Sequence, residues 1–209
     1  MTIRYSAIVF DMDGVLVDAR DWHFESLNEA LRIFGEEISR DEHESRFDGL
    51  PTKVKLRMLE DDGRIPAGLA TQIESVKQER TLRAAARLCF PNLEHLIMLA
   101  ELKRSGYKIG VATNSIRSSA SAMLNFAGVL ESLDVLVTNE DVERAKPDPA
   151  IYLKACESLG MNPNQILVFE DNQYGIAAAK AAGCDVVRVE SPLQLNLPFV
   201  ESWLRGGGS

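Results

Sequence analysis

The chain has 209 residues, enough for one core domain and a smaller accessory unit. Its hydrophobic share of 45% is typical of a folded globular protein, and its net charge of −8 without a basic block argues against a nucleic-acid surface. No apolar run approaches the ~20 residues that cross a bilayer, and the sequence starts without a signal-peptide pattern. We therefore expect a cytoplasmic monomer with no membrane and no nucleic-acid partner.

Short apolar runs bounded by turn residues predict five strands. Their hydrophobicity is nearly continuous rather than alternating, which is typical of parallel strands that are covered on both faces. The predicted strands are 7–10, 108–112, 134–137, 166–169 and 185–189. Helical segments at 117–126, 149–159 and 173–182 separate the later strands, and a glycine follows each helix. This alternation predicts an α/β fold with a doubly wound, Rossmann-like parallel sheet.

Roughly ninety residues separate the first two predicted strands, far more than a crossover of a dozen residues needs. Most of this stretch has helical periodicity, and its last part, 93–103, is expected to return the chain to the sheet. The predicted helices of the insertion are 21–34, 41–46, 52–59 and 67–86. We therefore predict a catalytic core at 1–16 and 89–205, an inserted all-α cap domain at 17–88, and a flexible tail at 206–209.

Polar residues follow four of the predicted strands at their carboxyl ends, where open α/β sheets bind ligands. Acidic side chains dominate this group, and a hydroxyl and a lysine accompany them. The candidates are Asp11, Asp13, Thr113, Lys146, Glu170 and Asp171. Clustered acids repel one another unless a cation is present, and oxygen ligands without His or Cys suit Mg²⁺. Mg²⁺ and Lys146 in turn favour a phosphorylated small molecule as the substrate.

Two of these acids have separate chemical roles in this hypothesis. Asp11 is the candidate nucleophile toward phosphorus, since aspartate forms acyl phosphates in other enzymes. Asp13 can donate a proton to the leaving oxygen and later take one from the attacking water. Thr113 supplies a hydroxyl donor for phosphate, although an ordinary strand-end hydroxyl is the alternative interpretation.

Four motifs in order resemble those of the haloacid dehalogenase-like superfamily, in particular its β-phosphoglucomutase-like branch with a helical cap after the first strand. They are FDMDGVL at 10–16, Thr113-Asn114, Lys146-Pro147 and Glu170-Asp171. The resemblance implies that Asp11 is phosphorylated and that Asp13 is the general acid and base. It also implies that Mg²⁺ is bound by Asp11, the carbonyl of Asp13 and Asp171.

The same resemblance assigns supporting roles to further residues. Glu170 is then a metal ligand or acts through water. The competing interpretation is an acid that the helix dipole favours near a helix N-terminus, and the two roles are compatible. Thr113 and Lys146 hold the transferred phosphate, assisted by backbone amides around Met12 and Asn114.

Cap residues are the candidates for substrate specificity. A turn at Gly49 points into the site of the related enzymes, and the mutase pattern has an arginine where this chain has Thr52. Lys53 is a possible substitute for that arginine. Lys77 matches a cap lysine of the family or is simply solvated, and His23 has either a substrate or proton role or a structural polar contact.

The leading hypothesis is therefore a Mg²⁺-dependent phosphatase that acts on a small phosphorylated metabolite, in particular a sugar phosphate. β-Phosphoglucomutase-type phosphotransfer is the alternative, which the absent arginine disfavours. A phosphonoacetaldehyde hydrolase would use a cap-loop lysine such as Lys53 but has a small residue in place of Asp13. A non-catalytic metabolite-binding protein would not need Asp11, Asp13 and Lys146 together.

Overall fold

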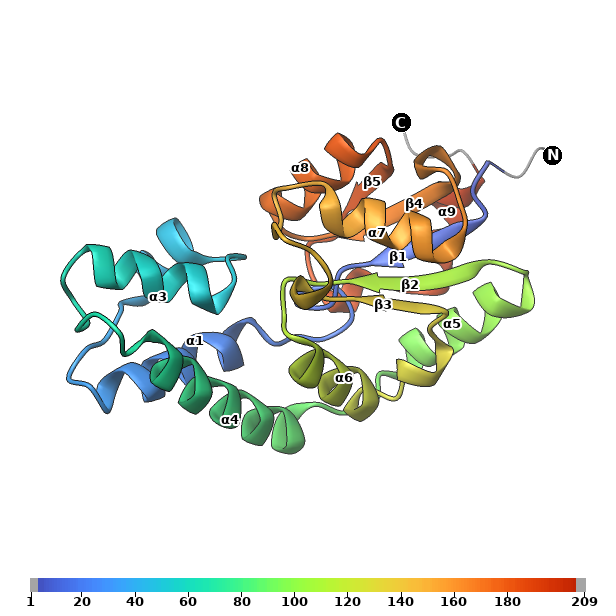
Figure 1. The fold of residues 1–209 in the computed structure, drawn as a ribbon. Helices are drawn as coiled ribbons and strands as arrows, with labels where there is room; N and C mark the ends of the chain where they lie inside the picture. Colours follow the sequence, from blue (N-terminus) through green and yellow to red (C-terminus); the bar gives the residue numbers. More distant parts are fainter. Residues whose placement is uncertain (1–3, 206–209) are drawn as a thin grey trace. The chain divides into compact units, whose positions relative to one another are not determined.

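A computed structural model describes residues 4–205, which fall into two compact units. The core unit comprises the described residues up to Asp18 and from Cys89 onward, and the helical unit is Ala19–Leu88. Within the described part of the core unit, five parallel strands form one sheet in the order β3-β2-β1-β4-β5 (Figure 1). Their bounds are β1 Ala7–Phe10, β2 Lys108–Ala112, β3 Val135–Val137, β4 Ile166–Glu170 and β5 Asp185–Arg188. The sheet confirms the predicted doubly wound fold.

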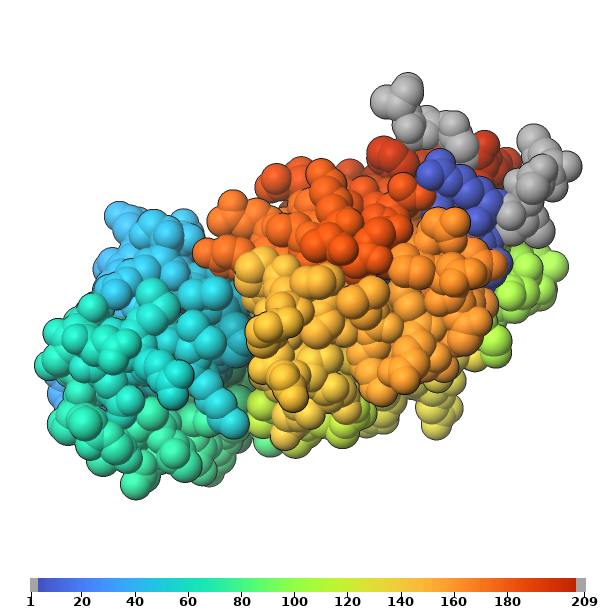
Figure 2. Space-filling view, turned by 45° about the horizontal axis from the view of Figure 1, so that its top comes forward, coloured from blue at the N-terminus to red at the C-terminus, as the bar shows by residue number. Residues whose placement is uncertain are grey.

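Side-chain alternation along β1 divides the core unit into two apolar layers. Ala7 and Val9 belong to the cluster that packs under α7 (Ala150–Leu159) and α8 (Gln173–Ala182). Phe10 instead stacks on Phe169 of β4, with ring centroids 5.4 Å apart. Figure 2 shows α7 in orange and α8 in orange-red covering neighbouring parts of one face of this unit. Both faces of the strands are thus apolar, as their unbroken hydrophobicity predicted.

The opposite face of the sheet is covered by α5 (Leu93–Arg104) and α9 (Leu197–Leu204), the second of which the sequence did not predict. Phe199 of α9 lies 6.0 Å from Phe169 between ring centroids, and His95 of α5 is within 2.9 Å of the Pro192 carbonyl. Helix α6 (Arg117–Phe126) follows β2, as predicted. The strand and helix boundaries otherwise lie within a few residues of the predicted ones, since terminal turns depend on capping contacts.

Four α-helices and a π-helical turn make up the helical unit as the structure describes it. They are α1 Arg20–Arg32, α2 Arg40–Glu42, the turn His43–Phe47, α3 Thr52–Asp61 and α4 Ala70–Leu88. The segment predicted as one helix at 41–46 is therefore one turn of α-helix followed by the π turn. Buried apolar residues from α1, α3 and α4 form a separate core, so this unit has its own hydrophobic interior.

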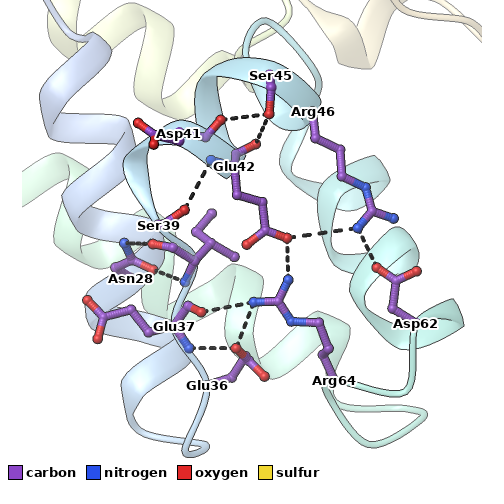
Figure 3. A network of polar contacts seen from close by, with 11 residues as sticks. Asn28, Glu36, Glu37, Ser39, Asp41, Glu42, Ser45, Arg46, Asp62 and Arg64 are labelled. Carbon is purple, nitrogen blue, oxygen red and sulfur yellow. Dashed lines mark hydrogen bonds and ion pairs between the residues drawn. The ribbon is translucent and has the colours of Figure 1, made fainter.

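A polar network ties the connections of the helical unit together (Figure 3). Arg64 donates to Glu36 Oε1 at 2.8 Å and to the Glu37 carbonyl at 2.9 Å, and it also pairs with Glu42. Arg46 pairs with Asp62 at 2.6 Å. The network joins segments that are up to 28 residues apart in the chain, and it ties the α1–α2 connection, α2 and the π turn to the segment that follows α3.

No helix among residues 4–205 is both long and apolar enough to cross a membrane. The three cysteines are buried and form no disulfide. The predicted flexible tail, 206–209, lies outside the described residues.

Candidate active site at the carboxyl ends of the strands

Strand register brings the predicted acids to one edge of the sheet. Phe10 of β1 pairs with Val111 of β2 and with Phe169 of β4. Asp11, the residue after β1, therefore lies beside Glu170 at the end of β4. The Asp11 N–H continues the ladder by donating to the Phe169 carbonyl at 2.9 Å, which fixes the backbone of this residue.

A tight loop follows Asp11. The Met12 carbonyl accepts from the N–H groups of Leu16 and Val17 at 3.0 and 2.9 Å, and Gly14 has φ of +83°. Only glycine adopts this backbone conformation at little cost, so Gly14 allows the chain to turn immediately after Asp13. Met12 is fully buried, and Asp11 and Asp13 flank it.

Lys146 lies at the centre of the site and is 4% exposed. Its Nζ donates to Asp11 Oδ1 at 2.6 Å, to Glu170 Oε1 at 2.5 Å and to the Ala112 carbonyl at 2.9 Å. Burial would lower the pKa of Lys146, but the carboxylates of Asp11 and Glu170 outweigh it and hold the pKa well above its ordinary value. Lys146 is therefore an ammonium group directed at the candidate nucleophile.

Glu170 is held by donors on both of its carboxylate oxygens. Oε1 accepts from Lys146 and from the Tyr152 hydroxyl, the latter at 3.1 Å. Oε2 accepts from the Asn172 N–H at 3.0 Å, next to the N-terminus of α8. These contacts favour an indirect role for Glu170 beside a metal, through water or through Lys146, over use of its oxygens as close ligands.

Three carboxylates nevertheless converge at this edge of the sheet. One ligand oxygen from each of Asp11, Glu170 and Asp171 lies within 4.8 Å of the others, and all three residues are buried. Burial, and then the charges of Glu170 and Asp171, raise the pKa of Asp11 well above its ordinary value, while Lys146 opposes them. An all-oxygen donor set with excess negative charge fits a hard divalent cation such as Mg²⁺.

The segment after β2 provides further donors. The Ser115 hydroxyl donates to Asp13 Oδ2 at 3.0 Å, and the Ser115 N–H donates to Thr113 Oγ1 at 3.1 Å. Asn114 accepts from the Lys146 N–H through Oδ1 at 3.1 Å, which ties this segment to the lysine loop. The geometry therefore brings Thr113 and Asn114 to the edge of the sheet that holds Asp11, Asp13 and Lys146.

The candidate specificity residues lie in the helical unit. Gly49 has φ of +72°, as a turn at this position requires, and Thr52 begins α3 half-buried. Lys53 is exposed. Lys77 Nζ lies 3.0 Å from Nδ1 of His23, so both residues have a polar contact within this unit.

Four residues with contacts to these groups were not among the predicted candidates. They are Tyr152 and Ser115 in the core unit, and His43 and Lys55 in the helical unit. Lys55 is buried and its Nζ lies 3.4 Å from His43 Nε2. Tyr152 lies within an apolar stretch of α7 that has the pattern of a core helix face. No signal in the sequence separates its hydroxyl from an ordinary core tyrosine.

Known proteins resemble this chain along most of its length. The family model of haloacid dehalogenase-like hydrolases matches residues 8–189. A phosphorylated carbohydrates phosphatase of Thermotoga maritima is 32% identical over 179 residues, which cover 86% of this chain and 82% of that protein. A validoxylamine A 7'-phosphate phosphatase of Streptomyces hygroscopicus subsp. limoneus is 33% identical over 187 residues, covering 86% and 83%.

Among solved structures, β-phosphoglucomutase from Clostridium difficile matches with a TM-score of 0.84 and 22% identity, over 97% of this chain and 98% of that one. This similarity shows a shared fold. The matches confirm the resemblance that the four motifs indicated.

Proposed function

The chain belongs to the haloacid dehalogenase-like hydrolase family, and we propose that it is a Mg²⁺-dependent phosphatase that hydrolyses a small sugar phosphate through an aspartyl-phosphate on Asp11. The contact of the Lys146 ammonium with Asp11 Oδ1, beside the carboxylates of Glu170 and Asp171, carries this proposal. The phosphatase relatives support hydrolysis, and the carbohydrate phosphatase of T. maritima supports a sugar phosphate as the substrate class.

The metal would be held by the side chains of Asp11 and Asp171 and by the Asp13 carbonyl, with Glu170 acting indirectly. Bound Mg²⁺ would withdraw charge from the phosphoryl oxygens and lessen their repulsion of the Asp11 carboxylate. Lys146 adds a fixed positive charge at Asp11 Oδ1, and Thr113 a hydroxyl donor. The nucleophile would thus remain ionised despite its buried, acidic surroundings.

The reaction has two displacements at phosphorus. In the first, an Asp11 carboxylate oxygen attacks phosphorus, the bond to the sugar oxygen breaks, and Asp13 donates its proton to that oxygen. In the second, Asp13 takes a proton from water, the water oxygen attacks phosphorus, and the bond to Asp11 breaks to release inorganic phosphate. Ser115, whose hydroxyl donates to Asp13 Oδ2 at 3.0 Å, orients this acid and base.

β-Phosphoglucomutase-type phosphotransfer is the alternative, with a sugar hydroxyl in place of water as the second acceptor. It would use the same aspartates, so the two activities differ in what binds at the cap. Thr52 stands where the mutase pattern has an arginine. Lys53 is exposed, so it does not replace that arginine as a buried contact to a second phosphate. The exposure of Lys53 also gives no support to the phosphonoacetaldehyde hydrolase alternative, in which a cap-loop lysine forms a Schiff base with the substrate.

The test is a panel of phosphorylated metabolites assayed for release of inorganic phosphate with Mg²⁺ present. We expect release from one or a few sugar phosphates, and none from the same compounds with the Asp11→Asn variant. Glucose 1-phosphate is assayed in parallel for isomerisation to glucose 6-phosphate. Accumulation of that isomer without phosphate release would overturn hydrolysis in favour of phosphotransfer. No turnover of any compound would overturn the proposed activity.

A further inference from the structure

Tyr152 is a buried residue in contact with Glu170 and Lys146. It lies in the first turn of α7 and is 1% exposed. Its hydroxyl donates to Glu170 Oε1 at 3.1 Å, and its ring centroid is 5.0 Å from Lys146 Nζ. One side chain therefore contacts both the ammonium group that faces Asp11 and the carboxylate that holds this ammonium in place.

Glu170 Oε1 is the shared acceptor in this arrangement. Lys146 and Tyr152 both donate to it, while Oε2 is held by the Asn172 N–H at 3.0 Å. The Tyr152 hydroxyl thus fixes the rotation of the Glu170 carboxylate about its terminal bond, which is otherwise a soft torsion. The direction of the Lys146 ammonium then follows from its two fixed oxygen acceptors, Glu170 Oε1 and the Ala112 carbonyl.

We propose that Tyr152 is a positioning residue that, through Glu170 and its own ring, aims Lys146 at Asp11. The inference rests on the proposed phosphatase function of this site. The ring supplies a favourable surface for the ammonium group, and the hydroxyl orients its counter-ion. A phenylalanine at 152 would keep the ring and the apolar packing but would leave one Glu170 lone pair without its donor.

The Tyr152→Phe variant separates positioning from packing. We expect kcat to fall by about tenfold, the effect of one charge-assisted hydrogen bond realised in the transition state. KM and the melting temperature should change little, since the apolar cluster around α7 is intact. A fall in melting temperature with unchanged kcat would overturn the proposal, because it would make the hydroxyl a purely structural group.

Tyr5→Phe is the matched control. Tyr5 is also buried, and its hydroxyl donates to a carboxylate, Asp185 Oδ2, at 2.9 Å. Tyr5 precedes β1 and Asp185 begins β5, so this pair lies at the amino ends of the strands, away from Asp11. We expect kcat of this variant to equal that of the wild type.

A double-mutant cycle with Glu170→Gln tests whether Tyr152 acts through Glu170. Tyr152→Phe should lower kcat by less than about twofold in the Glu170→Gln background, against about tenfold in the wild type. Equal effects in both backgrounds would contradict the proposed route.

A spectroscopic measurement tests the same idea without turnover. The ¹⁵N resonance of the Lys146 ammonium, assigned by its loss in Lys146→Met, should shift in Tyr152→Phe and not in Tyr5→Phe. An unmoved resonance would overturn the positioning role, even with kcat reduced. Conversely, a moved resonance in a protein without phosphatase activity would retain the positioning role and refute the proposed function.

Discussion

The Glu170 carboxylate occupies the space that a side chain at position 175 would need. A Cβ atom on Gly175 of α8 would lie 1.6 Å from Glu170 Oε1 and 2.0 Å from its Cδ. The helix that follows β4 therefore approaches the end of that strand closely only because residue 175 is glycine. The position of the carboxylate that accepts from Lys146 thus depends on the absence of one methyl group on the neighbouring helix.

Gly175→Ala should displace the Glu170 side chain and lower kcat by about tenfold or more, because Lys146 loses one of its two fixed acceptors. Alanine gains about 1 kcal/mol of helix propensity over glycine, but overpacking costs about 1–3 kcal/mol, so we expect a small net destabilisation. Phosphate release and urea unfolding check the two effects. Ala177→Ser, which adds an atom at an exposed position of the same helix, is the control. Full activity in Gly175→Ala would contradict the orienting role of Glu170.

Asp11→Asn should lower the rate of phosphate release about a thousandfold or more, while the chain still folds. The amide has nearly the shape of the carboxylate but is a poor nucleophile, and Lys146 keeps its contact with Glu170. The assay uses p-nitrophenyl phosphate, with circular dichroism as the check on folding. Glu157→Gln, which removes an exposed carboxylate from α7, should retain wild-type turnover. Retained turnover in Asp11→Asn would refute the assignment of Asp11 as the nucleophile.

Much of the site could be predicted because its main residues follow apolar strands. Unbroken hydrophobic runs identify parallel strands, and the carboxyl ends of such strands meet at one edge of the sheet. Asp11 and Asp171 were predicted in this way, and Lys146 from the loop after the third strand, with the four motifs as further support. The structure brings their side chains together.

The roles of the remaining residues depend on contacts between segments that are distant in the sequence, and the sequence pattern does not show these contacts. Tyr152 has the apolar spacing of a core helix, and its contact with Glu170 arises only when α7 packs on the sheet. Ser115 reaches Asp13 across 102 positions of the chain. Lys55 rather than Lys53 is the buried lysine of α3, because Lys55 lies on the same inward face of the helix as Leu56 and Leu59.

Mg²⁺ should stabilise the wild type against unfolding, and Asp171→Asn should lose most of this stabilisation. A ligand present at 100 times its dissociation constant stabilises the folded state by about 2.7 kcal/mol. Thermal melts with and without Mg²⁺, and again after chelation by EDTA, measure the effect in the absence of substrate. The Glu157→Gln variant should respond as the wild type does. Equal Mg²⁺ responses in the wild type and Asp171→Asn would remove Asp171 from the metal site.

Burial, and then the neighbouring Lys55 ammonium, lower the pKa of His43 to about 4. The unfolded chain has the ordinary value near 6.5, so it takes up a proton as the pH falls below 6.5 while the folded protein does not. The free energy of unfolding should therefore decrease between about pH 6.5 and pH 4, with His43 contributing about 2 kcal/mol of the loss. Above pH 7 the residue is neutral in both states and contributes no pH dependence.

The His43→Gln variant isolates this contribution, because glutamine retains an acceptor for Lys55 but does not titrate. Urea unfolding of the wild type and the variant at pH 7.5 and pH 4.5 cancels the contributions of all other groups, including the buried His95. We expect the pH-dependent loss to be smaller in His43→Gln by about 2 kcal/mol. Lys55→Met should move the His43 pKa back toward 6.5 in proton NMR titrations, because it removes the neighbouring positive charge. An identical pH-dependent loss in the wild type and His43→Gln would show that burial of this imidazole is not linked to acid stability.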